Sequence, residues 1–320
     1  MEDRSQNKPS VRKNKKSRRW LWLFAGLLVV LALVLALTPV YLSSDGFRRM
    51  IQAKIDRSTG GTAGIGRLTV GWLKGVRISD FSFSDEAGWT RVSINGIDAH
   101  PHLGALLSGT LSLGETVVDT PRIEIDLRKR PAPAVAQPSG VPEPPSPKAA
   151  GLMLVTDVVI NDGSVHLTDT SGKTVQVANL DSRVSVRPPG QASHFEVDMV
   201  VADAGHEATV SANSTVTPAK STGWTLKGTS GDIVVEVNDL KLDSLAPLFD
   251  LAGVELQAKG RVSADLKSTL QDGKLESVTA AIAGRDLDVG GTVLKGDRLQ
   301  TSDLFLSVSH NIVQVFLMVA

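Results

Sequence analysis

The chain has 320 residues, a formal net charge of zero and no cysteine. This length is enough to bury a sizeable core, and the lack of cysteine excludes disulfide frameworks and thiolate metal sites. The charge is unevenly distributed, because residues 1–19 sum to +6 and the remaining chain therefore sums to −6.

A long apolar segment directly follows this basic tail. Residues 20–42 contain no charged side chain and are long enough to cross a hydrocarbon core of about 30 Å. A basic run can also bind nucleic acid, but next to an apolar span it favours a cytoplasmic N-terminus. Trp20, Trp22 and Tyr41 lie near the two ends of the span, where aromatic rings prefer the membrane interface. No good signal-peptidase site follows. We therefore expect an uncleaved, single-pass signal anchor with a cytoplasmic N-terminus, a body on the other side of the membrane and no nucleic-acid partner.

A short amphipathic helix is expected next. Ser44 to Gly46 offers N-cap groups, and Gly60-Gly61 ends the helix. One apolar face is formed by Phe47, Met50, Ile51 and Ile55. This predicts a helix over residues 45–59.

Beyond the helix, apolar residues alternate with polar ones in many short runs separated by turn residues. Alternation changes parity at Ser79-Asp80, as at a β-bulge. One further helix, near residues 244–252, is predicted with Leu245, Leu248, Phe249 and Ala252 inward. These features predict a mainly β protein with a long, curved antiparallel sheet and few helices. The expected strands include 68–72, 76–78, 81–83, 92–94, 111–113, 123–127, 165–167, 175–177, 184–186, 195–199, 224–226, 233–237, 262–266, 278–282 and 304–306.

Residues 129–150 interrupt this pattern with seven of the chain's fifteen prolines. We predict a disordered, semi-extended insertion. It separates a first β-module (residues 43–128, including the helix) from a second (151–320), either as a domain boundary or as a loop within one sheet. The apolar run at 312–320 leads us to expect that the chain is the start of a longer protein.

No catalytic constellation is found. The chain has no Gly-x-Ser-x-Gly elbow, Walker loop or His-Glu-x-x-His motif. The glycine-rich segment 60–66 follows a helix and precedes a strand, the reverse of a dinucleotide loop, and is interpreted as a turn. We expect no enzyme activity, no metal and no cofactor.

The alternation itself carries the functional information. One face of each expected strand is aliphatic, with only 14 aromatic residues in the chain, and this face must be covered. The pattern leaves two possibilities open. The sheet either closes into a sandwich that serves as a structural or interaction module, or curls into an open trough whose apolar face contacts acyl chains.

Four parts of the chain carry recognisable patterns: Phe47–Ile55, Ile65–Ile78, Val159–Asp169 with Val177–Leu180, and Leu242–Phe249 leading to Leu256–Val262. They resemble the AsmA-like family, the TamB-related envelope proteins that are built from a repeating β-groove. The match covers most of residues 20–310 outside the proline-rich insertion, which is not a family feature. It rests on patterns rather than on invariant residues.

This resemblance implies a protein anchored in a bacterial inner membrane, with its body in the periplasm. Such a protein would bind or conduct phospholipid along a groove and so support outer-membrane lipid homeostasis and biogenesis. Membrane phospholipids are the implied partners, together with other envelope proteins. About sixteen to eighteen strands would extend roughly 80 Å, which is short for spanning a periplasm unaided. The expected groove-lining residues are Leu68, Val70, Ile78, Ile123, Ile125, Val165, Leu167, Val175, Val177 and Val262.

Overall fold

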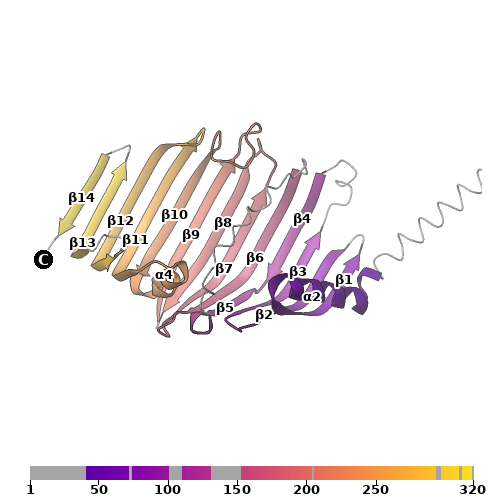
Figure 1. Ribbon diagram of the computed structural model, residues 1–320. Helices are drawn as coiled ribbons and strands as arrows, with labels where there is room; N and C mark the ends of the chain where they lie inside the picture. Colours follow the sequence, from indigo (N-terminus) through magenta and orange to yellow (C-terminus); the bar gives the residue numbers. More distant parts are fainter. Residues whose placement is uncertain are drawn as a thin grey trace, which may run out of the picture.

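The computed structural model describes residues 41–71, 74–100, 110–130, 153–203, 205–292, 297–309 and 312–318. Within them, all fourteen strands belong to one sheet (Figure 1). The prediction of a mainly β protein with one long curved sheet and few helices is confirmed. The strands are β1 (Gly61–Gly71), β2 (Gly75–Asp85), β3 (Thr90–His100), β4 (Thr110–Asp119), β5 (Arg122–Asp126), β6 (Met153–Thr168), β7 (Thr174–Val186), β8 (Ser193–Asp203), β9 (His206–Thr217), β10 (Ser230–Lys241), β11 (Leu256–Gln271), β12 (Lys274–Gly291), β13 (Arg298–Ser309) and β14 (Ile312–Met318).

The sequence predicted an antiparallel sheet, but the sheet also contains parallel pairs. β4 and β5 both pair with β6 in parallel, whereas every other pairing is antiparallel. A parallel pair needs a long crossover connection, and residues 131–152 between β5 and β6 are long enough to provide one. These residues lie outside the described ranges, but the strands on either side of them pair within one sheet.

Helix α2 (Asp45–Thr59) has the predicted bounds. The Ser44 hydroxyl accepts a hydrogen bond from the Phe47 N–H at the N-cap, and Gly60 ends the helix in the left-handed conformation with φ 65°. The next residues correct a prediction, because segment 61–66 is the start of β1 rather than a turn. Glycine suits position 64 of this strand, because any other residue would place its Cβ 2.5 Å from the Ser82 hydroxyl oxygen.

Side chains of α2 and the residues before it cover the free edge of β1. Ser43 Oγ accepts from Val70 N at 2.8 Å, Asp56 Oδ1 accepts from Ala63 N at 2.6 Å, and Arg48 donates to the Gly66 carbonyl. These bonds occupy backbone groups that an edge strand would otherwise offer to another chain.

The second helical region differs in detail from the prediction. A 3-10 turn, η2 (Leu242–Leu245), leads into the seven-residue helix α4 (Ala246–Ala252), which ends at Gly253. Leu248 is 40 % exposed and Ala252 is also exposed, so neither points inward as expected. Leu251 is the α4 side chain that packs on the core.

The predicted strand at 224–226 is also wrong. Trp224-Thr225-Leu226 alternates, but it lies in the connection 218–229 between β9 and β10. Gly223 and Gly228 flank the tripeptide with φ values of 65° and 76°, so turn geometry prevails over alternation here.

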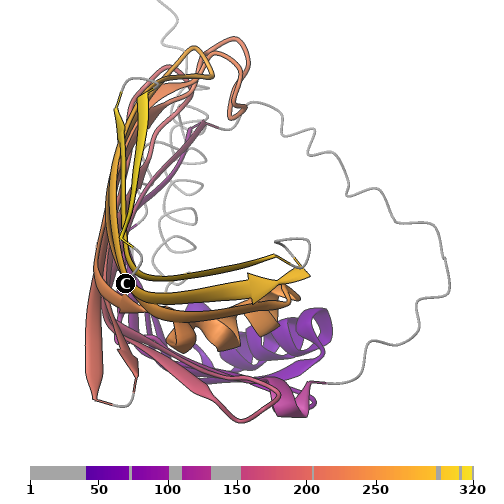
Figure 2. The same ribbon diagram turned by 90° about the vertical axis from the view of Figure 1, so that its left-hand side faces the viewer.

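A band of bends crosses the sheet and divides it into two walls, seen end-on in Figure 2. Residues with a left-handed backbone conformation (positive φ) lie along this band in β2, β6, β7, β10 and β12 and between β4 and β5. Along a strand, successive inward-facing side chains are normally two residues apart, but across the band they are three apart, as for Val237 and Leu240 in β10. Short polar side chains tolerate this conformation best. The residues are Asp80, Thr120, Asp162, Asn179, Asp239 and Asp286.

The predicted bulge at Ser79-Asp80 corresponds to one of these bends, with φ 56° at Asp80. The register, however, continues from Ile65↔Phe81 to Arg67↔Ser79 without an inserted residue. The neighbouring strand β1 changes its side-chain alternation opposite Asp80, between Ile65 and Leu68. Both strands change together, so their pairing continues without an extra residue. Register shifts do occur at this band between β6, β7 and β8 and between β10 and β11.

Candidate functional site

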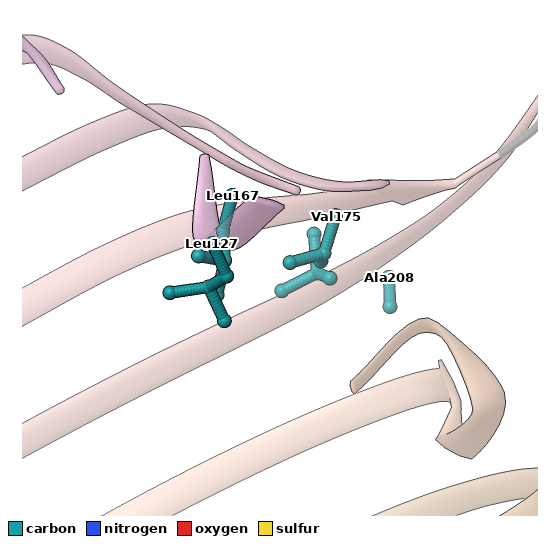
Figure 3. Close-up of a cluster of buried hydrophobic side chains, with 5 residues drawn as sticks. Leu127, Leu167, Val175 and Ala208 are labelled. Carbon is teal, nitrogen blue, oxygen red and sulfur yellow. The ribbon is translucent and has the colours of Figure 1, made fainter. Parts of the chain in front are cut away.

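One wall is covered on its inner face. Leu167 of β6 and Val175 of β7 are 1 % and 2 % exposed, and they pack with Val201 and Ala208 of the next two strands (Figure 3). Leu127, from the 3-10 turn η1 (Leu127–Lys129), completes this buried cluster. Leu251 of α4 packs against it. We call this half of the sheet the covered wall.

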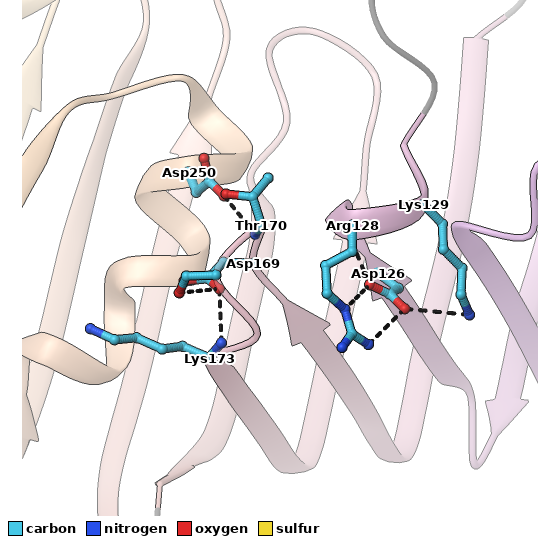
Figure 4. A network of polar contacts seen from close by, with 8 residues as sticks. Asp126, Arg128, Lys129, Asp169, Thr170, Lys173 and Asp250 are labelled. Atoms are coloured by element: carbon cyan, nitrogen blue, oxygen red, sulfur yellow. Dashed lines mark hydrogen bonds and ion pairs between the residues drawn. The ribbon is translucent and has the colours of Figure 1, made fainter.

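Polar contacts fasten the covering elements to the strands (Figure 4). Asp250 of α4 accepts hydrogen bonds from the backbone N–H and the hydroxyl of Thr170, at 3.0 and 2.9 Å. Within the same β6–β7 turn, Asp169 accepts from the Ser171 hydroxyl at 2.7 Å and from the Lys173 N–H at 2.8 Å. Burial alone would raise the pKa of Asp169, but these hydrogen bonds outweigh it and lower the pKa.

Asp126 holds η1 in place in the same way. Arg128 donates to its two carboxylate oxygens at 2.8 and 3.0 Å, and Lys129 lies 3.3 Å away. The hydrogen bond from Arg128 is the main cause that lowers the pKa of Asp126 to about 2. The turn that carries Leu127 therefore depends on an ionised Asp126.

This geometry predicts acid sensitivity. A carboxyl group whose pKa is depressed in the folded state stabilises that state above its unfolded pKa of about 3.9, and the contribution is lost as pH falls through the folded value. We expect the urea midpoint of the wild type to fall between pH 4 and the pKa of about 2. Asp126→Asn should start from a lower midpoint and fall less over this interval. Parallel curves for the two proteins would contradict the role of Asp126.

The other wall has an apolar inner face that no described element covers. Its side chains form continuous rows across neighbouring strands, as in Val197↔Ala212↔Val235 and on through Leu266, Ala280 and Val308. We call this half the open wall. From β6 to β13 its inner face includes Val158, Ile160, Val184, Phe195, Val197, Ala212, Ile233, Val235, Val237, Ala264, Leu266, Val278, Ala280, Ile282, Leu304, Leu306 and Val308. The row of Ile160 continues through β4 and β3 to Ile78 of β2 and Leu68 of β1.

Burial separates the two walls. Of the apolar residues named above for β6 to β13, only Ala280 is buried, at 8 % exposure, and Ile233 is 41 % exposed. In the described part of the chain, strands make extensive contacts only with their neighbours in the sheet, and the helical elements contact β1, β6, β7 and β11. No second sheet packs on the open wall within these residues. The outer face carries charged residues at alternate positions such as Glu236 and Lys267.

The structure divides the sequence-predicted lining residues between these environments. Two rows of them are adjacent on the covered wall, Ile123↔Val165↔Val177 and Ile125↔Leu167↔Val175. Leu68 of β1 is buried at 6 % exposure and pairs with Ile78 of β2, close to Val70. Val262 of β11 pairs with Leu240. The predicted residues thus share the inner face, but Leu68, Leu167 and Val175 are buried and offer little free surface.

The predicted Leu68 and Ile78 lie in the cross-strand row that reaches Ile160 of the open wall. Apart from Val262, the open-wall residues of β7 to β13 were not predicted, although most of their strands were expected. The alternation at 195–199, 233–237 and 278–282 marks one apolar face in each strand. The alternation does not indicate which half of a strand a helix covers. The position of α4 depends instead on the connection between β10 and β11, to which it belongs.

Several expectations fall on other parts of the chain. The predicted anchor, including Trp20 and Trp22, lies outside the described residues except for Tyr41, which is 67 % exposed, and Leu42. In the described ranges, no helix has both the length and the apolar character needed to cross a membrane. Among the same residues, no group of three or more histidine, aspartate or glutamate side chains is placed to hold a metal ion.

Comparison with known proteins does not assign a family. No protein-family profile matches the chain, and neither a curated protein nor a solved structure matches it significantly. The fold and its uncovered apolar face are therefore the basis for assigning a function.

Proposed function

We propose that the chain binds phospholipid, with acyl chains lying on the inner face of the open wall and headgroups in water. The proposal is carried by one observation: an apolar row that is continuous from Val197 in β8 to Val308 in β13 and that no described element covers. A contiguous apolar surface of this kind marks a binding site in a soluble region. Each acyl methylene removed from water contributes about 0.8 kcal/mol.

The dimensions of the open wall suit this ligand. In β10 the wall extends from Ser230 to Val237, a rise of about 27 Å at 3.4 Å per residue. A hydrocarbon core of about 30 Å holds two leaflets, so one acyl chain fits within the wall. The bend keeps the rows of both walls on one inner side (Figure 2).

In its full form, the proposal follows the sequence resemblance. Residues 20–42 would anchor the chain in a bacterial inner membrane with the sheet in the periplasm, where it would hold or conduct phospholipid for outer-membrane maintenance without catalysis. A closed sandwich was the alternative, and the single sheet formed by the described strands supports the open trough. No described feature favours a purely structural role over lipid binding.

Two adjacent valines of β10 provide a matched test. Val235 lies in the inner row, whereas Val234 faces outward between Asn213 and Lys267. The full chain, extracted in mild detergent, should carry phospholipid detectable by native mass spectrometry. Val235→Asp should lose most of it because a carboxylate in contact with an acyl chain is strongly unfavourable, and Val234→Asp should retain it.

Far-UV circular dichroism on both variants controls for folding. Equal phospholipid content in the two folded variants, or wild-type protein free of lipid, would refute the proposal.

A further inference from the structure

Three large apolar side chains stand exposed at one rim of the open wall. Trp224 and Leu226, in the connection between β9 and β10, are 51 % and 68 % exposed. Leu275, the second residue of β12, is 63 % exposed. We call Trp224, Leu226 and Leu275 the rim cluster.

Hydrogen bonds fix the backbone that carries the rim cluster. The Leu226 carbonyl accepts from Thr229 N at 3.1 Å, and the Lys227 carbonyl accepts from the Thr222 hydroxyl at 2.7 Å. Gly273 N donates to the Thr229 carbonyl at 2.7 Å, which joins this connection to the β11–β12 turn. Gly273 must remain a glycine, because a Cβ there would lie 2.3 Å from the Leu226 carbonyl oxygen. The two connections therefore form one ordered unit that holds its apolar side chains outward.

The composition of this unit matches a lipid interface. Full burial of a large apolar side chain contributes about 1.5–3 kcal/mol of favourable free energy. A surface that covers the three side chains would therefore be strongly favoured. The connection 218–229 contains Lys220 and Lys227 and no acidic residue, and Lys274 precedes Leu275, with Asp272 and Glu276 as the acids nearby in sequence. Tryptophan and lysine together are typical of the headgroup region, where the ring is partly buried and the ammonium group stays in water next to anionic lipid.

The position of the rim cluster indicates which membrane it contacts. β10 is eight strands from β1 in the sheet order, or roughly 40 Å at about 4.8 Å per strand. β1 is the edge strand next to the N-terminal region. With the sheet extending away from the bilayer that would hold residues 20–42, the rim cluster lies beyond that bilayer.

We infer that the rim cluster docks the open wall onto the surface of a second, anionic phospholipid membrane. Trp224, Leu226 and Leu275 enter the headgroup and acyl boundary, and Lys220, Lys227 and Lys274 contact anionic headgroups. This inference rests on the proposed function, because it provides the surface from which lipid would enter or leave the trough.

Fluorescence of a single tryptophan tests the docking on the full chain. The protein carries Trp20→Phe, Trp22→Phe, Trp72→Phe and Trp89→Phe, so that only Trp224 remains, and it is held in phosphatidylcholine nanodiscs. Added vesicles of phosphatidylglycerol and phosphatidylcholine with brominated acyl chains should quench most of the Trp224 emission. The matched control moves the indole to an exposed site on the outer face, with Phe305→Trp and Trp224→Phe in the same background; Phe305 is 46 % exposed. This control should not be quenched.

The outcomes separate docking from lipid binding in the trough. In the wild-type background, Leu226→Ser with Leu275→Ser should weaken vesicle binding about tenfold or more while the phospholipid bound to the purified protein stays unchanged. No quenching of Trp224, equal quenching of the control, or quenching only by brominated lipid placed in the nanodisc would overturn the docking to a second membrane. Loss of bound phospholipid in Val235→Asp would still support the trough in each of these cases.

Discussion

Leu167→Ala is expected to lower the free energy of unfolding by about 2–5 kcal/mol. Leu167 is 1 % exposed, and its neighbours come from β7, β8, β9, η1 and α4, so truncation leaves a cavity that no single element can fill. Because the sheet has no second layer in its described part, this cluster is the main buried apolar contact between the sheet and its covering elements. Urea unfolding of the full chain, followed by far-UV circular dichroism, measures the change.

Leu275→Ala is the matched control for this experiment. The same side chain is removed from a position that is 63 % exposed, so the change should stay within about 0.5 kcal/mol. A loss at Leu167 no larger than at Leu275 would show that the covered wall is not a core.

Much of the fold could be predicted because its determinants are local. The bounds of α2 follow from Ser44 and Gly60, which cap the helix at its two ends. Strand alternation at 123–127, 165–167 and 175–177 placed strands correctly, since cross-strand pairs such as Ile123↔Val165 need apolar residues on the same face.

The errors arise where distant parts of the chain decide the structure. Glycines in segment 60–66 indicated a turn, but they fit beside Phe83, Ser82 and Asp80 of β2, a contact that no local pattern reveals. The parallel pairing of β4 and β5 with β6 joins segments that are far apart in the sequence, such as Thr110 and Met153, and no local pattern indicates it. For the site, the sequence indicated the apolar face but not the place of α4, so the lining was sought partly among residues that form the core.

Gly260→Ala is expected to have the largest effect of any substitution in the band of bends, because Gly260 brings β11 close to β12 there. Its φ of 100° is strained for any residue with a Cβ, and an added Cβ would lie 2.5 Å from the Asp286 carbonyl oxygen and 2.6 Å from that of Arg285. Conformational strain and displaced backbone together should cost about 3 kcal/mol or more. The urea midpoint in the same assay measures this.

Gly290→Ala provides the control in the same region of the sheet. Gly290 is not in the left-handed region, and a Cβ there would meet only the Arg298 side chain at 3.5 Å, so we expect a change within about 0.5 kcal/mol. The pair also tests the functional role of the bend. If Gly260→Ala stays folded at low temperature, its walls should no longer converge on one inner face, and bound phospholipid should decrease while Gly290→Ala retains it. Wild-type stability and lipid content in Gly260→Ala would show that neither the fold nor lipid binding depends on the bend at this strand.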